Sequence, residues 1–195
     1  MRLLMQSGEK KEKELDLELF KIEHYVEMVL NYLRMASDTS DLLIAEYDLD
    51  NIIKQAVRKY AKSFIYKRLS LNYIPTECRV LTDEKWLLFV IEQILSNSLK
   101  YTNKGGISIY LEDREKKILV IEDTGIGIWE EDLPRVFEKG FTGYNGRTDK
   151  KSTGIGLYLC KNILKRLSHT IRIESKEGRG TRVKIGLKMI EMEIE

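Results

Sequence analysis

The sequence predicts an α+β protein, a two-layer α/β sandwich in which helices cover one face of a mixed, mostly antiparallel sheet, preceded by a long helix. Three observations lead to this prediction. The first 36 residues carry a helical apolar repeat, strand-like and helix-like segments then alternate in mixed order, and a glycine-rich irregular stretch interrupts the second half. Elements in such an order are typical of helices gathered on one face of an antiparallel sheet.

Composition limits the class of protein. The chain has 195 residues, 43% of them hydrophobic, which is enough for a packed core and excludes a disordered chain. A net charge of +2 gives no electrostatic case for nucleic acid, which is normally bound by a basic excess. No apolar run approaches the roughly 18 to 20 residues that cross a membrane, so we expect this segment to be soluble. With two cysteines and two histidines, a Cys/His metal site is excluded.

The N-terminal 36 residues predict one long helix with a seam for a partner helix. Apolar residues recur every three or four positions, a period of about 3.5 that is typical of supercoiled interfaces: Leu15, Leu19, Ile22, Val26, Val29, Leu33 and Ala36. A second stripe runs beside it: Tyr25, Met28, Tyr32 and Met35. Two adjoining stripes favour a four-helix bundle formed by dimerisation. The alternative is a helix that folds back on its own domain.

A run of small and turn-forming residues over 36–41 marks the predicted domain boundary, within a linker over 37–45. The pattern then predicts a strand at 46–48, a helix over 50–67, two strands, and a helix that is capped by Thr82 or Asp83 and ends near Tyr101. The two strands between the helices lie at 70–74 and 78–81. A hairpin, a helix and two closing strands complete the chain, at 107–111 with 118–121, at 155–167, and at 170–174 and 181–187.

The first of four chemical motifs lies on the helix that ends near Tyr101. Gln93, Asn97, Lys100 and Tyr101 share one side of this helix, and apolar residues occupy another. An amide oxygen with phosphate oxygens and waters is a reasonable shell for Mg²⁺, and a lysine one turn on can meet a phosphate charge. Taken alone, such a polar side is more often a solvated helix face.

Two glycine motifs follow. In Asp123-Thr124-Gly125-Ile126-Gly127-Ile128, after a strand, an aspartate can accept a hydrogen bond from a purine amine while glycines let the backbone approach the ring. In Ser152-Thr153-Gly154-Ile155-Gly156-Leu157, free N–H groups at a helix start make an anion site. The plainer alternatives are a tight turn and an ordinary helix start. Position 130 is Glu and no Walker loop occurs, which argues against a dinucleotide fingerprint and a P-loop.

Between the glycine motifs lies a long loop. Phe137 and Phe141 can anchor it, and its span over 139–151 combines glycines with Arg147, Lys150 and Lys151. A structureless loop of this length in a compact domain is usually functional or disordered. A basic mobile lid over polyphosphate is the functional interpretation, and a merely flexible loop is the alternative.

Taken in the order of the chain (the polar helix, the first glycine motif, the phenylalanine loop and the second glycine motif), the four motifs resemble the N, G1, F and G2 boxes of bacterial sensor histidine kinases. These enzymes belong to the wider ATPase superfamily that includes DNA gyrase and shares the Bergerat ATP-binding fold. The resemblance covers residues 46–187, and Gly178-Arg179-Gly180-Thr181 is similar to the closing Gly-x-Gly-Thr of the family. It implies an ATP-binding catalytic domain over 46–195, with ATP and Mg²⁺ as cofactors.

The resemblance also implies residue roles. Asn97 would bind Mg²⁺, Lys100 would contact phosphate and Tyr101 would pack against the nucleotide. Asp123 would accept from adenine, and Thr181 would join it through a water molecule. The lid would span about 138–153. The other implied nucleotide contacts are Gly125, Gly127, Ile128, Lys139, Gly154, Gly156 and Leu157.

One position departs from the family pattern. Gln93 stands where many histidine kinases have a first asparagine and where gyrase-like ATPases have a catalytic glutamate. An amide cannot act as a general base, so we expect no vigorous ATP hydrolysis. The neighbouring Glu92 is the candidate proton acceptor for a histidine nucleophile. The candidate catalytic residues are therefore Glu92, Gln93 and Asn97.

The helix over 14–36 resembles the second helix of the dimerising hairpin of histidine kinases, especially the intramembrane-sensing kinases of the bacitracin-resistance type. Residues 2–5 would be the tail of the first helix. The phosphoacceptor motif, a histidine followed by an acidic or amide residue and then Thr-Pro, is absent, and His24 and His169 are expected to be structural.

We therefore expect a homodimeric fragment from the cytoplasmic portion of a membrane-bound kinase, which touches the membrane only through segments not present here. It would transfer the γ-phosphoryl group of ATP to a histidine that this sequence lacks, and onward to the receiver domain of a response regulator, so the fragment itself would be unable to autophosphorylate. The alternative is a non-catalytic nucleotide-sensing dimerisation module. Gln93 disfavours a gyrase-like clamp, and the long helix disfavours a serine kinase of the anti-sigma-factor type.

Overall fold

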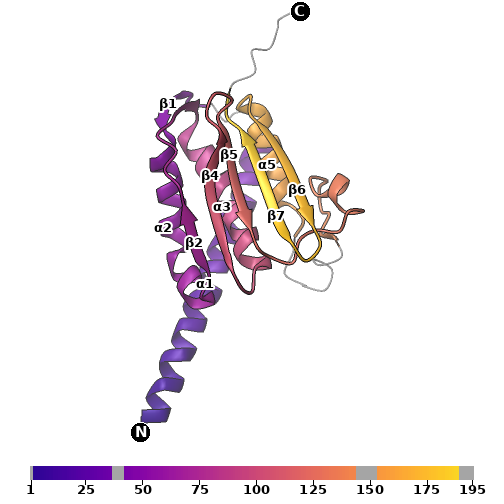
Figure 1. The fold of residues 1–195 in the computed structure, drawn as a ribbon. Helices are drawn as coiled ribbons and strands as arrows, with labels where there is room; N and C mark the ends of the chain where they lie inside the picture. Colours follow the sequence, from indigo (N-terminus) through magenta and orange to yellow (C-terminus); the bar gives the residue numbers. More distant parts are fainter. Residues whose placement is uncertain (1, 37–41, 144–152, 189–195) are drawn as a thin grey trace, which may run out of the picture. The chain divides into compact units, whose positions relative to one another are not determined.

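A computed structural model describes residues 2–36, 42–143 and 153–188 of the chain. The chain divides into two compact units, residues 1–41 and 42–195 (Figure 1). The dividing point lies within the predicted linker, and residues 37–41 of that linker lie outside the described residues. Each unit is described by itself.

The first unit is a single helix, α1 (Arg2–Ala36). The predicted single long helix is confirmed, and residues 2–5, which the resemblance assigned to the tail of a first helix, continue into it without a break. Most residues between them and Glu14 are Glu or Lys, strong helix formers that carry the helix through Gly8. Six side chains of the predicted seam are exposed in the single chain: Leu15, Leu19, Ile22, Val26, Val29 and Leu33. In the part of the chain that the structure describes, no helix is both long and apolar enough to cross a membrane.

The second unit is built on a five-stranded sheet in the order β2-β4-β5-β7-β6. β2 and β4 run parallel and the other neighbouring pairs run antiparallel, which confirms the predicted mixed, mostly antiparallel sheet. The strands are β2 (Ser70–Tyr73), β4 (Gly106–Asp113), β5 (Ile118–Asp123), β6 (Thr170–Lys176) and β7 (Gly180–Gly186). A separate two-stranded sheet pairs β1 (Ala45–Asp48) with β3 (Arg79–Thr82).

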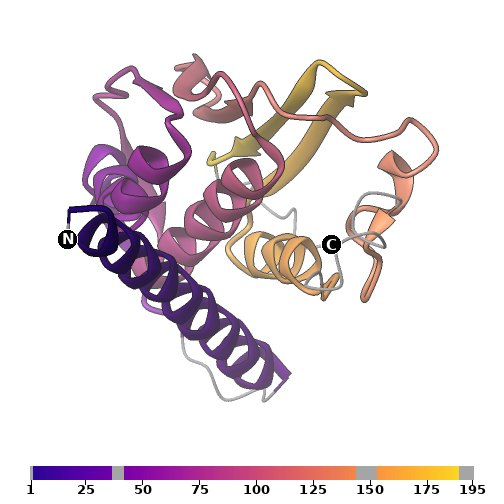
Figure 2. The same cartoon turned by 90° about the horizontal axis from the view of Figure 1, so that it is seen from below.

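Three helices cover one face of the large sheet: α2 (Leu49–Lys67), α3 (Glu84–Tyr101) and α5 (Gly156–Arg166) (Figures 1 and 2). A short 3₁₀ helix, η1 (Leu133–Arg135), lies in the irregular stretch before α5. Apolar side chains from both layers are fully buried between them, among them Leu87, Ile91, Ile94, Ile107, Ile109, Ile121 and Ile185. Their burial is the main stabilising contribution to this two-layer unit.

Aspartates begin the first two helices of this unit. The carboxylate of Asp48 accepts from the backbone N–H of Asp50 at 2.8 Å, and that of Asp83 accepts from Trp86 N–H at 3.1 Å. Asp83, and not Thr82, is therefore the cap of α3. Thr82 is fully buried and its hydroxyl lies 3.1 Å from Nε2 of His169. Burial lowers the pKa of His169 to about 4, in keeping with the structural role expected for it.

A lysine closes the other end of α3. The ammonium of Lys67, in the last turn of α2, donates to the carbonyls of Leu99, Lys100 and Thr102, the latter two at 3.3 and 2.9 Å. The last carbonyls of a helix lack partners within the helix, and a cation is favourable at that end of the dipole. This contact fixes to α2 the end of α3 that carries Lys100 and Tyr101.

Candidate functional site

Asp123 ends β5 and its carboxylate is the most connected acceptor of the candidate site. The side chain is 6% exposed and accepts from Gly125 N–H at 2.9 Å, from the Ser98 hydroxyl at 3.0 Å and from Thr181 N–H at 3.3 Å. Burial raises the pKa of Asp123, and these three hydrogen bonds oppose the rise. Because two carboxylate oxygens offer about four acceptor positions, room remains for a donor from a ligand.

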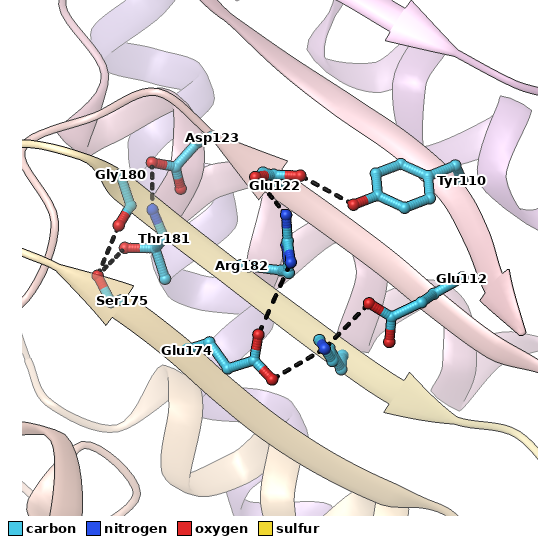
Figure 3. Close-up of polar contacts among 10 residues, drawn as sticks. Tyr110, Glu112, Glu122, Asp123, Glu174, Ser175, Gly180, Thr181 and Arg182 are labelled. Atoms are coloured by element: carbon cyan, nitrogen blue, oxygen red, sulfur yellow. Dashed lines mark hydrogen bonds and ion pairs between the residues drawn. The ribbon is translucent and has the colours of Figure 1, made fainter.

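Asp123 belongs to a row of polar residues that crosses three strands. Thr181 lies opposite Asp123 on β7, and Ser175 lies opposite Thr181 on β6 (Figure 3). The hydroxyl oxygens of Ser175 and Thr181 are 2.9 Å apart. Because successive strand residues point to opposite faces, the neighbours of this row form a separate ion-pair network on the other face of the sheet: Arg182 with Glu122 at 3.0 Å and with Glu174 at 3.8 Å.

The loop after β5 is tied on both sides by backbone groups. Ile126 N–H donates to the carbonyl of Tyr101 at the end of α3, at 3.1 Å, and the Ile126 carbonyl accepts from Gly178 N–H at 2.7 Å. Ile128 N–H donates to the Ser175 hydroxyl at 2.9 Å. The predicted loop residues Gly125, Gly127 and Ile128 are therefore held between α3 and the β6–β7 hairpin.

Gly180 of that hairpin approaches Asp123 closely. Its φ is +92°, and a Cβ atom added there would lie 1.9 Å from the Asp123 carbonyl oxygen. Only glycine fits such a contact in this conformation. Gly180 thus lets the closing Gly-x-Gly-Thr segment lie directly against the end of β5.

The polar side of α3 meets the start of α5. Gln93, predicted on that side, is buried, and a Cβ atom added to Gly156 would lie 2.3 Å from its Nε2. The Gln93 carbonyl oxygen is buried and has no hydrogen-bond partner among the described residues. Asn97 and Lys100 are half-buried, and the Lys100 ammonium lies 5.3 Å from the ring centroid of Tyr101. The structure therefore brings the first and fourth motifs together.

α5 begins at Gly156 with no side-chain hydrogen bond at its cap, followed by Leu157 in the first turn. Helix N-termini with free N–H groups bind anions. Close by, Gly140 N–H donates to the Gly154 carbonyl at 3.0 Å, which joins the two ends of the predicted lid next to the exposed Lys139. Residues 144–152, including Arg147, Lys150 and Lys151, lie outside the described residues.

The two aromatic anchors predicted for this loop are each covered by a cation. The guanidinium of Arg135 lies 4.4 Å from the ring centroid of Phe141, and the ammonium of Lys161 lies 5.5 Å from that of Phe137. Lys161 belongs to α5, so this contact ties the loop before the lid to the helix after it.

The side chain of Glu92 contacts α2. Its carboxylate forms an ion pair with Lys59 of α2, at 2.7 Å, and the residue is 7% exposed. The structure thus directs Glu92 toward α2, because neighbouring residues on a helix face different sides. Its predicted role as proton acceptor for a histidine stays a prediction.

Two residues of the site were not predicted. Ser98 lies on the sheet-facing side of α3 and is 2% exposed, and a lone hydroxyl on an apolar face was the available signal. Ser175 lies one residue beyond the strand predicted over 170–174, and its role depends on contacts with residues distant in sequence. No local pattern marks it.

Comparison with known proteins identifies the family. Residues 82–191 match the family described as histidine kinase-, DNA gyrase B-, and HSP90-like ATPase. Sensor histidine kinase YxdK of Bacillus subtilis is 36% identical over 174 residues, 86% of this chain and 53% of the relative. Sensor histidine kinase GraS of Staphylococcus haemolyticus is 35% identical over 187 residues, 93% of this chain and 54% of the relative. The chain thus spans about half the length of these curated relatives.

Solved structures share the fold. The histidine kinase AdeS of Acinetobacter baumannii superposes with a TM-score of 0.65 at 22% identity, over 90% of this chain and 83% of that one. ShkA, solved in full length with AMPPNP, gives a TM-score of 0.69 at 18% identity, over 90% of this chain and 37% of that one. The predicted fold class is confirmed, as is the resemblance. The chain belongs to the histidine kinase-, DNA gyrase B- and HSP90-like ATPase family.

Proposed function

We propose that this chain is the ATP-binding catalytic portion of a two-component sensor histidine kinase. The γ-phosphoryl group of ATP goes to a histidine outside the present sequence and then to the receiver domain of a response regulator. Two groups of contacts carry the proposal: the acceptor row around Asp123, and the contact of Gln93 with the uncapped start of α5. The relatives that are sensor histidine kinases support it.

The residues present fit a bound adenine nucleotide. Asp123 accepts from the adenine amine and Thr181 joins it, while Tyr101 packs beside the nucleotide and Lys100 meets phosphate charge. Gly154, Gly156 and Leu157 present backbone N–H groups to the phosphates, as an anion-binding helix start does. ATP supplies the group to be transferred. The protein contributes position and charge neutralisation, which are the main sources of catalysis in phosphoryl transfer.

The magnesium ion of this proposal depends on the nucleotide. Within the described ranges, no group of three or more His, Cys, Asp or Glu side chains is placed to hold a metal ion. Mg²⁺ commonly keeps several waters and binds through few protein ligands plus substrate phosphates. The half-buried amide of Asn97 is the protein ligand that we propose.

Dimerisation belongs to the same proposal. The exposed seam of α1 pairs with a second copy, because a helix cannot bury such a stripe alone. The intact kinase is membrane-bound, with this portion in the cytoplasm. His24 and His169 are the histidines of the sequence, and neither begins a phosphoacceptor motif, so we propose that the chain does not phosphorylate itself.

Calorimetric titration with AMPPNP and Mg²⁺ tests the nucleotide site. Asp123→Asn removes the charged acceptor and should weaken binding by ~1–3 kcal/mol, about 5- to 150-fold. Glu122→Gln is the matched control, because the neighbouring carboxylate lies in the ion-pair network on the other face and its loss should leave affinity within about twofold. No binding by the unchanged chain, or equal losses in both variants, would overturn the assignment.

The alternative, a non-catalytic nucleotide sensor, needs a second experiment. A histidine-bearing helical segment from a relative is fused ahead of α1, and the fusion is incubated with labelled ATP. Acid-labile label on the fusion, reduced by Asp123→Asn, supports the kinase. Nucleotide binding without any such label favours the sensor.

A further inference from the structure

We propose that Ser175 is a positioning residue that sets the base selectivity of the nucleotide site. It holds the hydroxyl of Thr181 as a hydrogen-bond acceptor, so the site accepts a purine with an amine and rejects one with a carbonyl at the same position. This inference rests on the proposed function, because it assumes that a nucleotide base binds beside Asp123.

The argument begins with the single proton of the Ser175 hydroxyl. Its oxygen lies 2.7 Å from the carbonyl oxygen of Gly180. A carbonyl cannot donate, so the Ser175 proton must lie in this contact. The same hydroxyl oxygen accepts from Ile128 N–H at 2.9 Å. Ser175 therefore has no proton left for a third partner.

The third partner is Thr181, whose hydroxyl oxygen is 2.9 Å from that of Ser175 (Figure 3). Two oxygens at this distance need a proton between them. Since Ser175 has used its own, Thr181 must donate. The Thr181 hydroxyl is then oriented toward β6, and only its lone pairs remain for a ligand.

The carboxylate of Asp123 is likewise only a hydrogen-bond acceptor. It accepts three hydrogen bonds from the protein and offers a ligand only further acceptor positions. A water molecule held between Asp123 and Thr181 would have to donate both of its protons to them, which leaves it only its lone pairs for the base. With or without such a water, Asp123 and Thr181 offer only acceptors, so an amine placed against them is paired and a carbonyl in the same place is not.

Loss of the Ser175 hydroxyl would release this constraint. The Thr181 hydroxyl could then rotate and donate, and a purine carbonyl would find a partner. Ile128 N–H would lose its acceptor as well, which loosens the loop after β5 for every nucleotide alike. The ratio of two affinities separates these effects, because loop loosening cancels in it.

The experiment compares ADP with IDP, which has a carbonyl in place of the amine and a proton on the neighbouring ring nitrogen N1. The Thr181→Val cycle below isolates the part of the preference that depends on the Thr181 hydroxyl. Affinities are measured by calorimetry for the unchanged chain, Ser175→Ala and Ser175→Thr. Ser175→Ala should narrow the preference for ADP about 3- to 10-fold, the effect of about one neutral hydrogen bond. Ser175→Thr should retain the preference, because it keeps the hydroxyl and suits a strand.

A cycle with Thr181→Val completes the test. Without the Thr181 hydroxyl, Ser175→Ala should leave the ADP-to-IDP ratio unchanged. If Ser175→Ala does not fold, Ser175→Cys replaces it, and its weaker donor should give an intermediate ratio. Equal losses of ADP and IDP affinity in Ser175→Ala, or in Ser175→Cys where it replaces that variant, would leave the ratio unchanged and would overturn the inference. Failure of the unchanged chain to bind ADP would instead overturn the proposed function.

Discussion

The two polar groups of the candidate site, one at Asp123 and one at the start of α5, are built in opposite ways. At the Asp123 end, side chains and backbone groups from β5, β6, β7 and α3 satisfy one another through the contacts of Ser98, Thr181 and Ser175. At the α5 end, the Gln93 carbonyl has no partner among the described residues and the helix start lacks a side-chain cap. The Gln93 amide packs directly against Gly156, in the space that a Cβ atom would take.

This difference separates what folding provides from what a ligand must provide. Polar groups that pair within the protein fix a geometry before binding, which lowers the ordering cost of the ligand. A buried polar group that has no hydrogen-bond partner in the protein gains the most free energy when a ligand provides that partner. We therefore expect changes at the Asp123 end to affect folding and base selectivity, and changes at the α5 end to affect local packing and phosphate binding.

The largest effect is expected for a glycine of the hairpin at the Asp123 end. Gly180→Ala places a Cβ atom 1.9 Å from a backbone oxygen at a φ of +92°, and should lower the free energy of unfolding by about 3 kcal/mol or more. Gly178→Ala is the control in the same hairpin. Its φ is +70° but no atom lies within 4 Å, so it should cost only about 1 kcal/mol. Urea denaturation measures both, and equal losses would show that the approach to Asp123 is unimportant.

A smaller effect is expected at the α5 end. Gly156→Ala should cost about 1–2 kcal/mol of unfolding free energy because the Gln93 amide must move. In a Gln93→Ala background the obstacle is gone, and the same change should be neutral or stabilising, because alanine is the better helix former. The double-mutant cycle in urea therefore predicts a coupling of about 1–2 kcal/mol. Additive costs would mean that Gln93 and Gly156 do not depend on each other.

The smallest effect concerns pH. Burial raises the pKa of Asp123, so its carboxylate takes up a proton at a higher pH than an ordinary aspartate and then loses one acceptor for the base. ADP affinity should fall as the pH is lowered from neutral toward that raised pKa, by a few-fold more than in Asp123→Asn. Calorimetry at several pH values measures this, with Asp123→Asn correcting for titration of the nucleotide phosphate. Parallel pH profiles in the two proteins would contradict it.

Protonation of Asp123 weakens ADP binding but has the opposite effect on the stability of the fold. A carboxyl group whose folded pKa is raised binds its proton more tightly in the folded state than in the unfolded state. Its contribution to stability is therefore fully present at low pH and is lost as the pH rises through the raised pKa. Weaker ADP binding in mild acid cannot then be attributed to Asp123 unfolding the ligand-free protein.

Local patterns were enough to predict the helices and most strands. The segments predicted over 50–67 and 155–167 agree with α2 and α5 to within one residue at each end, because helical period and caps are local signals. Strand partners were not predictable in this way. The consecutive segments at 70–74 and 78–81 join different sheets, since pairing depends on β4 and β1, which lie elsewhere in the sequence.

The candidate site shows the same difference between residues that local patterns identify and contacts that depend on distant parts of the chain. The motif order identified Asp123, Thr181, Gln93 and Gly156, and the strand register and the packing of α3 on α5 bring them into two groups. Their roles toward nucleotide stay predictions. Ser98 and Glu92 show where pattern reading is limited, because helix periodicity does not reveal which partner a buried polar side chain meets. Ser98 meets Asp123, and Glu92 meets Lys59.

The lysine at the end of α3 has a consequence for chemical labelling. An acylating reagent needs a free, neutral amine, and the Lys67 ammonium is committed to three carbonyls. It reacts only when the last turn of α2 separates from α3, whereas the exposed Lys54 on the same helix reacts at any time. The relative rate of acylation at these two lysines, read by peptide mass spectrometry, therefore reports how often the end of α3 that carries Tyr101 separates from α2, without a probe attached to the site.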